Sequence, residues 1–282
     1  LMRSAHRRTL VLLVALLPVL SCAVGREKRD HESADPELTD TNFLAQGPHV
    51  DSEGTGAACP HGMVLVEGNY CPDVEQKCLR WMDPPGPYQH FRCAEYAQPS
   101  RCIGARVPMR FCIDRVEFAS EGTVASAQGA AAQPMPVPQN FLSFSDGQRL
   151  CAARGARLCK ESEWQFACEG EEMRPYPYGF VRDATACNTD ITQNLGRTGR
   201  LVDHRAPGGA FGRCKSPFGV YDLSGNLEEW VEADNRFQKG AREVMKGSWW
   251  IPSRHACRSF QIGHGSEYGG GETGIRCCRG AE

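Results

Sequence analysis

Cysteine is the residue type in this sequence with the most chemical potential, and there are fifteen of them. Thiols bind soft metals, act as nucleophiles or pair as disulfides, depending on their spacing and compartment. No CxxC pair occurs, and no cluster of Cys and His has the short, fixed spacing of a zinc site. So many cysteines without such a site are uncommon in a reduced compartment. The cysteines therefore predict disulfides in an oxidising compartment.

A glycine-centred loop at residues 221–230 brings acidic and amide oxygens together. Calcium takes roughly six to eight oxygen ligands and accepts backbone carbonyls, so Asp222 and Glu229 on either side of Gly225 could enclose one ion. On spacing alone, an ordinary turn with solvated acids is the more common use of such a loop. The eight histidines form no HExxH or HxxxHxE group, and no GxSxG pattern occurs. Nothing therefore indicates a histidine-bound iron or zinc centre or a serine nucleophile.

Composition narrows the class of protein further. The chain has 282 residues, of which 23% are charged and 41% hydrophobic, as in ordinary soluble globular proteins. Lys and Arg number 32 against 34 for Asp and Glu, a net charge of -2. Binding to nucleic acid depends on a basic excess that neutralises phosphates, and this chain lacks one. We therefore expect no nucleic-acid partner.

The N-terminus has the pattern of an export signal. Basic residues between 3 and 8 precede an apolar run at 10–20, which is too short to span a bilayer comfortably. The run ends in Val19-Leu20-Ser21-Cys22, which resembles the lipobox of bacterial lipoproteins, where the cysteine is acylated after cleavage just before it. The alternative is a plain signal peptide cut nearby. Setting Cys22 aside leaves fourteen cysteines, an even number that can all pair.

Three regions follow from this pattern. Residues 1–21 are predicted to be a signal peptide, and residues 22–58 a lipidated Cys22 with a flexible, acidic linker that lacks periodicity. Residues 59–282 are predicted to form the folded domain. The expected location is a bacterial membrane, with the protein anchored as a lipoprotein on the periplasmic side or at the cell surface.

The folded region predicts little regular secondary structure. One helix is expected at 145–154, with Ser145 and Asp146 as caps, and another at 160–168, with Ser162 as its cap. No further helix of normal length is expected before residue 279. Short apolar runs broken by Gly and Pro predict an irregular α+β domain with a small sheet, and a cysteine-rich insertion occupies about 70–110. Adjacent Cys277 and Cys278 point differently along an extended strand and should pair with different partners.

A series of motifs resembles the formylglycine-generating enzyme family, also called sulfatase-modifying factor domains. Residues 218–230 match the family's GLYDMxGNVWEW, and residues 157–167 are similar to its RLPTEAEWEYA. Shorter matches follow the family's order at 62–68, 111–117, 177–179, 246–250 and 274–276. The resemblance implies the family's C-type-lectin-like α+β fold, here rich in disulfides.

The resemblance also implies structural calcium. The family has two calcium sites. Two of its residues begin the first site. Four others hold the second ion, two of them through their backbone carbonyls. The matching residues here are Asn188 and Thr189 for the first site, and Asp222, Gly225, Leu227 and Glu229 for the second.

Disulfide pairings are implied for part of the chain. Cys151 and Cys168 match half-cystines that pair, in the family, with positions resembling Cys277 and Cys257. A third bridge, Cys187–Cys214, is suggested by the loop region that these two residues share. The resemblance assigns no partner to Cys59, Cys71, Cys78, Cys93, Cys102, Cys112, Cys159 or Cys278.

One departure from the family affects its chemistry. The family's enzymes oxidise a substrate cysteine with molecular oxygen at copper(I), which two thiolates hold just after the GGS[WY] stretch. Between Gly247 and Ile275 this chain has only Cys257. Counted forward from Trp249, Cys257 falls on the second copper ligand. Counted back from Cys277, it falls on the structural half-cystine. We prefer the second alignment. Copper(I) selects soft thiolates, so copper and formylglycine generation are not expected.

A candidate cleft and three functional readings remain. The stretch that lines the family's substrate cleft holds Trp249, Trp250, Arg254, His255 and Arg258 here, although these can equally be core tryptophans and paired arginines. The preferred reading is a non-catalytic binding or accessory module at the cell surface, with a protein, peptide or glycan ligand and no assigned catalytic residue. The alternatives are a divergent oxidoreductase with altered metal chemistry and a true oxidase with an unusual site.

Overall fold

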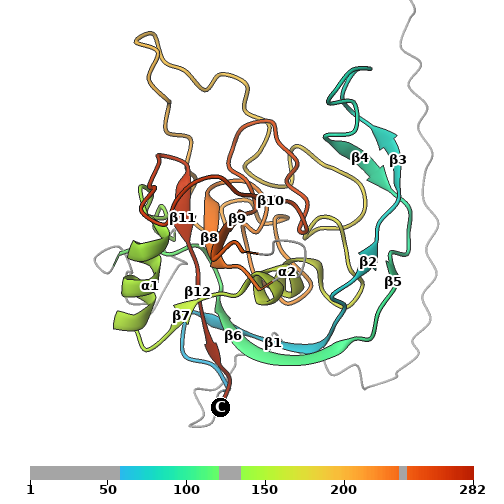
Figure 1. Cartoon of the computed structure of the whole chain (residues 1–282). Helices are drawn as coiled ribbons and strands as arrows, with labels where there is room; N and C mark the ends of the chain where they lie inside the picture. Colours follow the sequence, from blue (N-terminus) through green and yellow to red (C-terminus); the bar gives the residue numbers. More distant parts are fainter. Residues whose placement is uncertain (1–57, 121–134, 235–239) are drawn as a thin grey trace, which may run out of the picture. The chain divides into compact units, whose positions relative to one another are not determined.

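Two small four-stranded sheets form the framework of the domain. The computed structural model describes residues 58–120, 135–234 and 240–282, so the predicted signal peptide, Cys22 and the linker up to residue 57 lie outside the described residues (Figure 1). The first sheet has the order β1-β6-β12-β7 and is antiparallel throughout. Its strands are β1 (Met63–Tyr70), β6 (Val107–Asp114), β12 (Cys277–Gly280) and β7 (Arg157–Leu158).

The second sheet is mixed and has the order β10-β9-β8-β11. Its strands are β10 (Phe260–Gln261), β9 (Glu243–Lys246), β8 (Glu228–Glu232) and β11 (Thr273–Ile275). Strand β11 runs parallel to β8 and is followed after one residue by β12 of the first sheet. The segment from β11 to β12 therefore joins the two sheets directly.

Two helices pack beside the sheets close to the predicted positions. Helix α1 spans Phe144–Ala153 and α2 spans Glu161–Glu169. Ser145 and Ser162 were wrongly predicted as caps, whereas Asp146 completes the capping box of α1. Ser143 caps α1, where its hydroxyl accepts from the backbone N–H of Asp146, while Ser162 of α2 instead donates to Asp234. The N-cap is the residue at which the chain turns into the helix. When several serines lie close together, the sequence alone does not show which of them that is.

The two larger of three buried clusters draw on both sheets and form most of the core. Trp164 and Phe166 of α2 pack with residues of β1, β6, β8 and β9. Phe144 of α1 packs with Trp230 of β8 and Ile275 of β11. Since short strands and two helices bury so much aromatic surface, side-chain packing rather than regular backbone structure holds the two sheets together.

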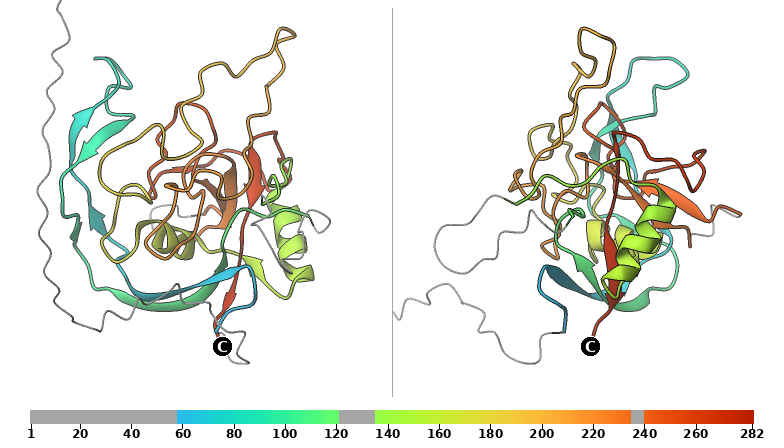
Figure 2. Two further views of the ribbon diagram at one scale, coloured as in Figure 1. Left: turned by 180° about the vertical axis from the view of Figure 1, so that it is seen from behind. Right: turned by 90° about the vertical axis from the view of Figure 1, so that its left-hand side faces the viewer.

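The cysteine-rich insertion forms an arm beside the core (Figure 2). It contains two small antiparallel pairs, β2 (Val74–Glu75) with β5 (Arg101–Cys102) and β3 (Cys78–Trp81) with β4 (Cys93–Tyr96). Arg258 joins this arm to the core, because it pairs with Glu169 of α2 at 2.6 Å and donates to the backbone carbonyls of Cys71 and Pro72.

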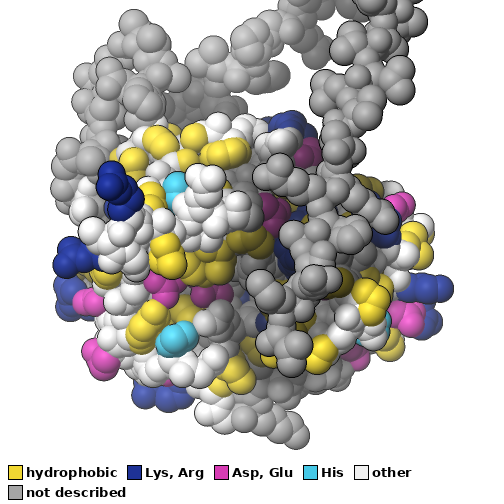
Figure 3. All heavy atoms as spheres, turned by 90° about the horizontal axis from the view of Figure 1, so that it is seen from above, with side chains coloured by type: hydrophobic (Ala, Val, Ile, Leu, Met, Phe, Trp, Pro, Cys, Tyr) yellow, Lys and Arg dark blue, Asp and Glu magenta, His cyan; other side chains and the backbone are white. Residues whose placement is uncertain are grey.

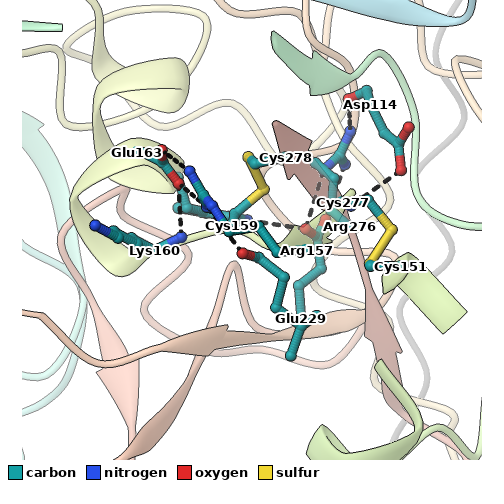
Figure 4. Close-up of a disulfide and its surroundings, with 12 residues drawn as sticks. Asp114, Cys151, Arg157, Cys159, Lys160, Glu163, Glu229, Arg276, Cys277 and Cys278 are labelled. Atoms are coloured by element: carbon teal, nitrogen blue, oxygen red, sulfur yellow. Dashed lines mark hydrogen bonds and ion pairs between the residues drawn. A yellow bond between two sulfur atoms is a disulfide. The ribbon is translucent and has the colours of Figure 1, made fainter. Parts of the chain in front are cut away.

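Seven disulfides join all the cysteines of the described residues. Cys277 and Cys278 of β12 pair with different partners, as their adjacency predicts (Figure 4). The structure also contains the pairings that the sequence analysis expects for Cys151, Cys168 and Cys187. The bridges are Cys59–Cys112, Cys71–Cys102, Cys78–Cys93, Cys151–Cys277, Cys159–Cys278, Cys168–Cys257 and Cys187–Cys214. The predicted disulfide-rich α+β fold with little regular secondary structure is confirmed.

The two bridges of β12 predict a specific stability effect. Cys159 and Cys278 are separated by 119 residues, and unfolded-chain entropy alone would assign such a bridge about 5 kcal/mol. The neighbouring bridge Cys151–Cys277 already holds these ends together. We therefore expect Cys159→Ala/Cys278→Ala to lower the free energy of unfolding by only about 2–3 kcal/mol in denaturant titrations.

The four-alanine variant that lacks both β12 bridges is the control. Its free energy of unfolding should fall by more than the sum of the decreases in the two single-bridge variants. Once one bridge is absent, removing the other frees a much longer loop in the unfolded chain. Additive losses would show that the two bridges act independently.

Candidate functional site

The loop at 221–230 is held in an unusual backbone conformation that only particular residues allow. Asp222, Gly225 and Asn226 all have positive φ, at 61°, 81° and 59°. A Cβ at Gly225 would lie 2.2 Å from the carbonyl oxygen of Asn188. Glycine is therefore required at this position both for its backbone angle and for the close approach.

The same loop binds the 188–206 segment through Asn226. The Asn226 side-chain oxygen accepts from the Nδ2 of Asn188 at 2.8 Å and from the backbone N–H of Ala206 at 2.8 Å. The Nδ2 of Asn226 donates to Glu117. This asparagine is buried and uses both ends of its amide, so it positions three segments at once.

Glu229 and Arg276 form a fully buried ion pair behind the loop (Figure 4). Arg276 donates from Nη2 to Oε1 of Glu229 at 2.8 Å and from Nε to Oε2 at 3.0 Å. Trp164 donates its indole N–H to Oε2 of Glu229 at 2.9 Å. Arg276 also donates to the backbone carbonyls of Asp114 and Tyr221. These bonds offset the desolvation that a buried charge pair costs.

More negative than positive charge is buried at this place. Burial, followed by the nearby charges of Asp222 and Glu229, raises the pKa of Glu117 well above its usual range. Burial likewise raises the pKa of Asp222 to about 6. Arg276 lowers the pKa of both groups but cannot balance three carboxylates. The region therefore favours an additional positive charge or a retained proton.

The predicted calcium ligands lie in this region, but the carboxylates among them already have hydrogen-bond partners. Asp222 accepts from the backbone N–H of Gly209 at 2.7 Å. Both oxygens of Glu229 are bonded to Arg276 or Trp164. Across the described ranges, no group of three or more His, Cys, Asp or Glu side chains is arranged to hold a metal. The oxygen-rich donor set fits calcium in chemistry, and calcium here stays a prediction.

The first predicted calcium site contacts the second one directly. The carbonyl of Asn188 accepts the backbone N–H of Asn226 at 3.0 Å, and a Cβ at Gly225 would also meet the methyl group of Thr189. The Nδ2 of Asn188 additionally donates to the carbonyl of His204. The structure thus brings the two predicted sites together where Asn188 and Thr189 meet Gly225.

The predicted cleft residues divide into buried and exposed groups. Trp250 is fully buried, with its ring against Trp249 and His204. His255 is also buried, and its ring nitrogens face the carbonyls of Gly247 at 3.3 Å and Ile251 at 2.8 Å. Both residues therefore belong to the interior, which the alternative reading expected for the tryptophan and not for the histidine.

The two predicted cleft arginines also differ. Arg258 is tied to Glu169 and holds the cysteine-rich arm, so it has a structural role. Arg254 is exposed, and its guanidinium lies 5.3 Å from the ring centre of Phe91. Of the five predicted residues, Arg254 is exposed, and Trp249 and Arg258 are half-buried.

The state of Cys257 decides between the two alignments left open by the sequence. Its sulfur is bonded to Cys168 at 2.05 Å and is fully buried. Cys257 is therefore the structural half-cystine that the sequence analysis preferred, and it presents no thiolate to a metal.

Sequence reasoning missed Glu228, which stands where the family motif GNVWEW has its first tryptophan. Glu228 is buried, and burial with the nearby charge of Glu272 raises its pKa to about 8. Glu272 in turn accepts a hydrogen bond from the hydroxyl of Tyr268. The mismatch with the motif was a visible signal, but burial of an acid cannot be read from a motif.

The chain matches one protein family and resembles two characterised groups of proteins. Residues 89–281 match the Sulfatase-modifying factor enzyme 1-like domain. The chain is 28% identical over 160 residues to the inactive C-alpha-formylglycine-generating enzyme 2 of Bos taurus, covering 53% of this chain and 52% of that protein. It is 29% identical over 107 residues to hercynine oxygenase of Mycolicibacterium smegmatis, covering 36% and 23%. The chain thus spans about half the length, or less, of these relatives.

Solved structures with a similar trace include two proteins. CarF has a TM-score of 0.45 at 16% identity, with 79% of this chain and 99% of that chain covered. PvdO from Pseudomonas aeruginosa has a TM-score of 0.43 at 16% identity, with 79% and 95% covered.

The buried ion pair predicts a large effect of one mutation. Glu229→Gln leaves Arg276 without its charge partner in the interior, and we expect the free energy of unfolding to fall by about 3–5 kcal/mol in denaturant titrations. The control is Asp183→Asn, which removes the exposed pair with Arg213 and should cost less than about 1 kcal/mol. Equal losses would show that burial does not determine the strength of these pairs.

His255 predicts a pH dependence of stability. Burial, reinforced by the charge of Arg182, lowers the pKa of His255 from 6.5 to about 4. Between these values the unfolded chain binds more protons than the folded one, so stability falls as the pH drops from about 6.5 towards 4. The loss attributable to His255 is up to about 3 kcal/mol.

The measurement compares unfolding of the wild type and of His255→Asn across this pH range. Asparagine tolerates the positive φ of 49° and does not titrate. We expect the stability difference between the two proteins to change with pH in this window. Parallel profiles would mean that His255 has the same pKa in the folded and unfolded chains.

Proposed function

We propose, from the premise that the chain belongs to the Sulfatase-modifying factor enzyme 1-like domain family, that it is an exported, non-catalytic binding or accessory module. The observation that carries this proposal is the bridge between Cys257 and Cys168. It converts the only cysteine between Gly247 and Ile275 into a buried disulfide, and copper(I) needs thiolates. A relative that matches over about half of this chain is itself named inactive.

We propose calcium as a structural cofactor of this module and do not expect copper. The support is the group of buried carboxylates around Asp222, whose pKa values are raised by burial first and by one another's charges second. Asp222 and the backbone carbonyls of Gly225 and Leu227 would hold the ion, with Glu229 shared between it and Arg276. Bound calcium would supply the positive charge that Arg276 alone does not.

The proposed location is outside the cytoplasm, on a bacterial membrane. Seven disulfides favour an oxidising compartment, and the basic and apolar N-terminal segments favour export. Cys22 is the proposed site of lipidation. None of the described helices is long and apolar enough to cross a membrane. The proposed ligand at the cell surface is a protein, a peptide or a glycan.

Mass spectrometry of the mature protein, before and after reduction, tests the absence of catalysis. We expect no free thiol between Cys59 and Cys278, together with calcium but no copper in the same sample. We also expect no conversion of a cysteine peptide to formylglycine when copper(I) is added. Cys168→Ala provides the control, because it frees the Cys257 thiol for detection.

A free Cys257 with copper or iron bound in the wild type would contradict the proposal. That result would favour a divergent oxidoreductase with altered metal chemistry, the class to which the name of the related hercynine oxygenase points.

A further inference from the structure

Two hairpin tips project from the same end of the domain in every view (Figures 1 and 2). One tip belongs to the β3–β4 hairpin of the cysteine-rich arm, and the other is a hairpin at 194–202. We call the first the aromatic tip and define it by Leu79, Trp81, Met82, Tyr88 and Phe91. We call the second the leucine tip and define it by Leu195, Arg197, Arg200 and Leu201.

The aromatic tip is exposed although it is held firmly in place. Tyr88 is 76% exposed, and its ring packs edge-on against Phe91. The Cys78–Cys93 disulfide closes the base of the hairpin. A rigid apolar surface loses little conformational entropy on binding, so it is suited to docking.

The acid at the aromatic tip is neutralised within the tip. Asp83 accepts from the backbone N–H of Arg92 at 2.7 Å and pairs with its guanidinium at 2.6 Å. This pair also fixes the loop between the strands, because it joins residues on opposite sides of the turn. The aromatic side chains are therefore presented without a free negative charge beside them.

The leucine tip combines apolar and basic side chains. Leu195 is 68% exposed, and it faces Leu201 across an isolated backbone bridge. The backbone N–H of Gly196 donates to the carbonyl of Arg200 at 2.8 Å and closes the turn. Arg197 and Arg200 are exposed, and within the described ranges neither forms an ion pair.

One residue ties the bases of both tips together. The backbone N–H of Arg182 donates to the carbonyl of Ala94 in β4 at 2.9 Å. Its guanidinium binds both carboxylate oxygens of Asp190, just before the leucine tip, at 2.7 and 2.9 Å. The two tips are thus connected through a short, half-buried link that also neutralises Asp190.

Apolar tips with uncompensated arginines suit a particular kind of partner. Seen from this end, hydrophobic side chains spread across the face, and basic and acidic side chains alternate around its rim, with further acids near its centre (Figure 3). Trp and Tyr favour the boundary between water and lipid, and Arg is attracted to anionic headgroups. Two separate projections also meet a flat surface together, whereas a small ligand would contact only one of them.

We propose that the aromatic and leucine tips form a docking face for an anionic lipid surface. This goes beyond the proposed function and does not depend on it, because the face needs neither the acyl chain on Cys22 nor the absence of catalysis. Docking would set the orientation of the domain against a membrane, which a tether alone does not.

Vesicle binding tests the proposal. The protein is the chain from residue 22 onward with Cys22→Ser, so that no acyl chain can attach, and its fourteen remaining cysteines are checked for complete pairing. The probes are phosphatidylcholine vesicles with and without phosphatidylglycerol, and co-sedimentation is measured at low and high salt. We expect binding to the anionic vesicles that weakens with salt and is much weaker on the neutral ones.

Variants assign the binding to the tips. Arg197→Ser/Arg200→Ser should weaken affinity for anionic vesicles about 30-fold, since each basic residue near such a surface contributes about fivefold. Tyr88→Asp/Leu195→Asp should remove most of the binding at both salt concentrations. Both pairs are exposed, so neither is expected to affect folding.

Matched controls change the same residue types elsewhere. Arg110→Ser/Arg149→Ser removes two arginines from β6 and α1, and Val107→Asp alters an exposed apolar residue at the start of β6, away from the tips (Figure 1). These variants should bind as the wild type does. Failure of the wild type to bind anionic vesicles, or equal losses in tip and control variants, would overturn the proposal. The first result would assign the face to a folded protein partner instead.

Discussion

The buried ion pair between Arg276 and Glu229 is the interaction on which the rest of the structure depends. Arg276 is the residue between β11 and β12, so it lies where the chain passes from one sheet to the other. Its guanidinium binds Glu229 of β8 and the backbone carbonyls of Asp114 and Tyr221. A charge without water must keep these partners, because losing one costs several kcal/mol. The two sheets and the 221–230 loop are therefore fixed relative to one another.

The disulfides of β12 make this arrangement hard to undo. Cys277 and Cys278 follow Arg276 directly, and their partners lie in α1 and just after β7. The residue beside the buried charge is thus covalently held on both faces of the strand. The network keeps several acids close together in the interior, where burial and then their mutual charges raise the pKa of Glu117 and Asp222. Rigidity at this point is what allows an unfavourable concentration of charge to persist.

The sequence predicted those features of the fold and the site that depend on residues near one another in the chain, and missed those that depend on distant ones. Both helices were expected within one residue because their apolar spacing is local, whereas the cap at Ser143 was missed since it depends on where the preceding chain turns. The acidic residues around Gly225 drew attention to the loop at 221–230, and the family resemblance supplied the pairing of Cys151 and Cys168. It could not show that Trp250 and His255 are buried, or that Arg276 is the partner of Glu229, because those facts depend on contacts between segments far apart in sequence. The exposure of the two tips is equally a property of the assembled domain.

The bridge at Cys257 has a further consequence for where this protein can act. In an oxidase of this family the reactive sulfurs must be available to a metal, whereas here the sulfur is buried and bonded to Cys168 of α2. The same bond anchors α2, whose Glu169 holds Arg258 and through it the cysteine-rich arm. Counted forward from Trp249, Cys257 would be a copper ligand. In the structure it instead helps to support the arm that carries the aromatic tip. A chain whose sulfurs stabilise the presentation of its surface is suited to work through that surface, which is why we place function at the tips and not at the centre of the fold.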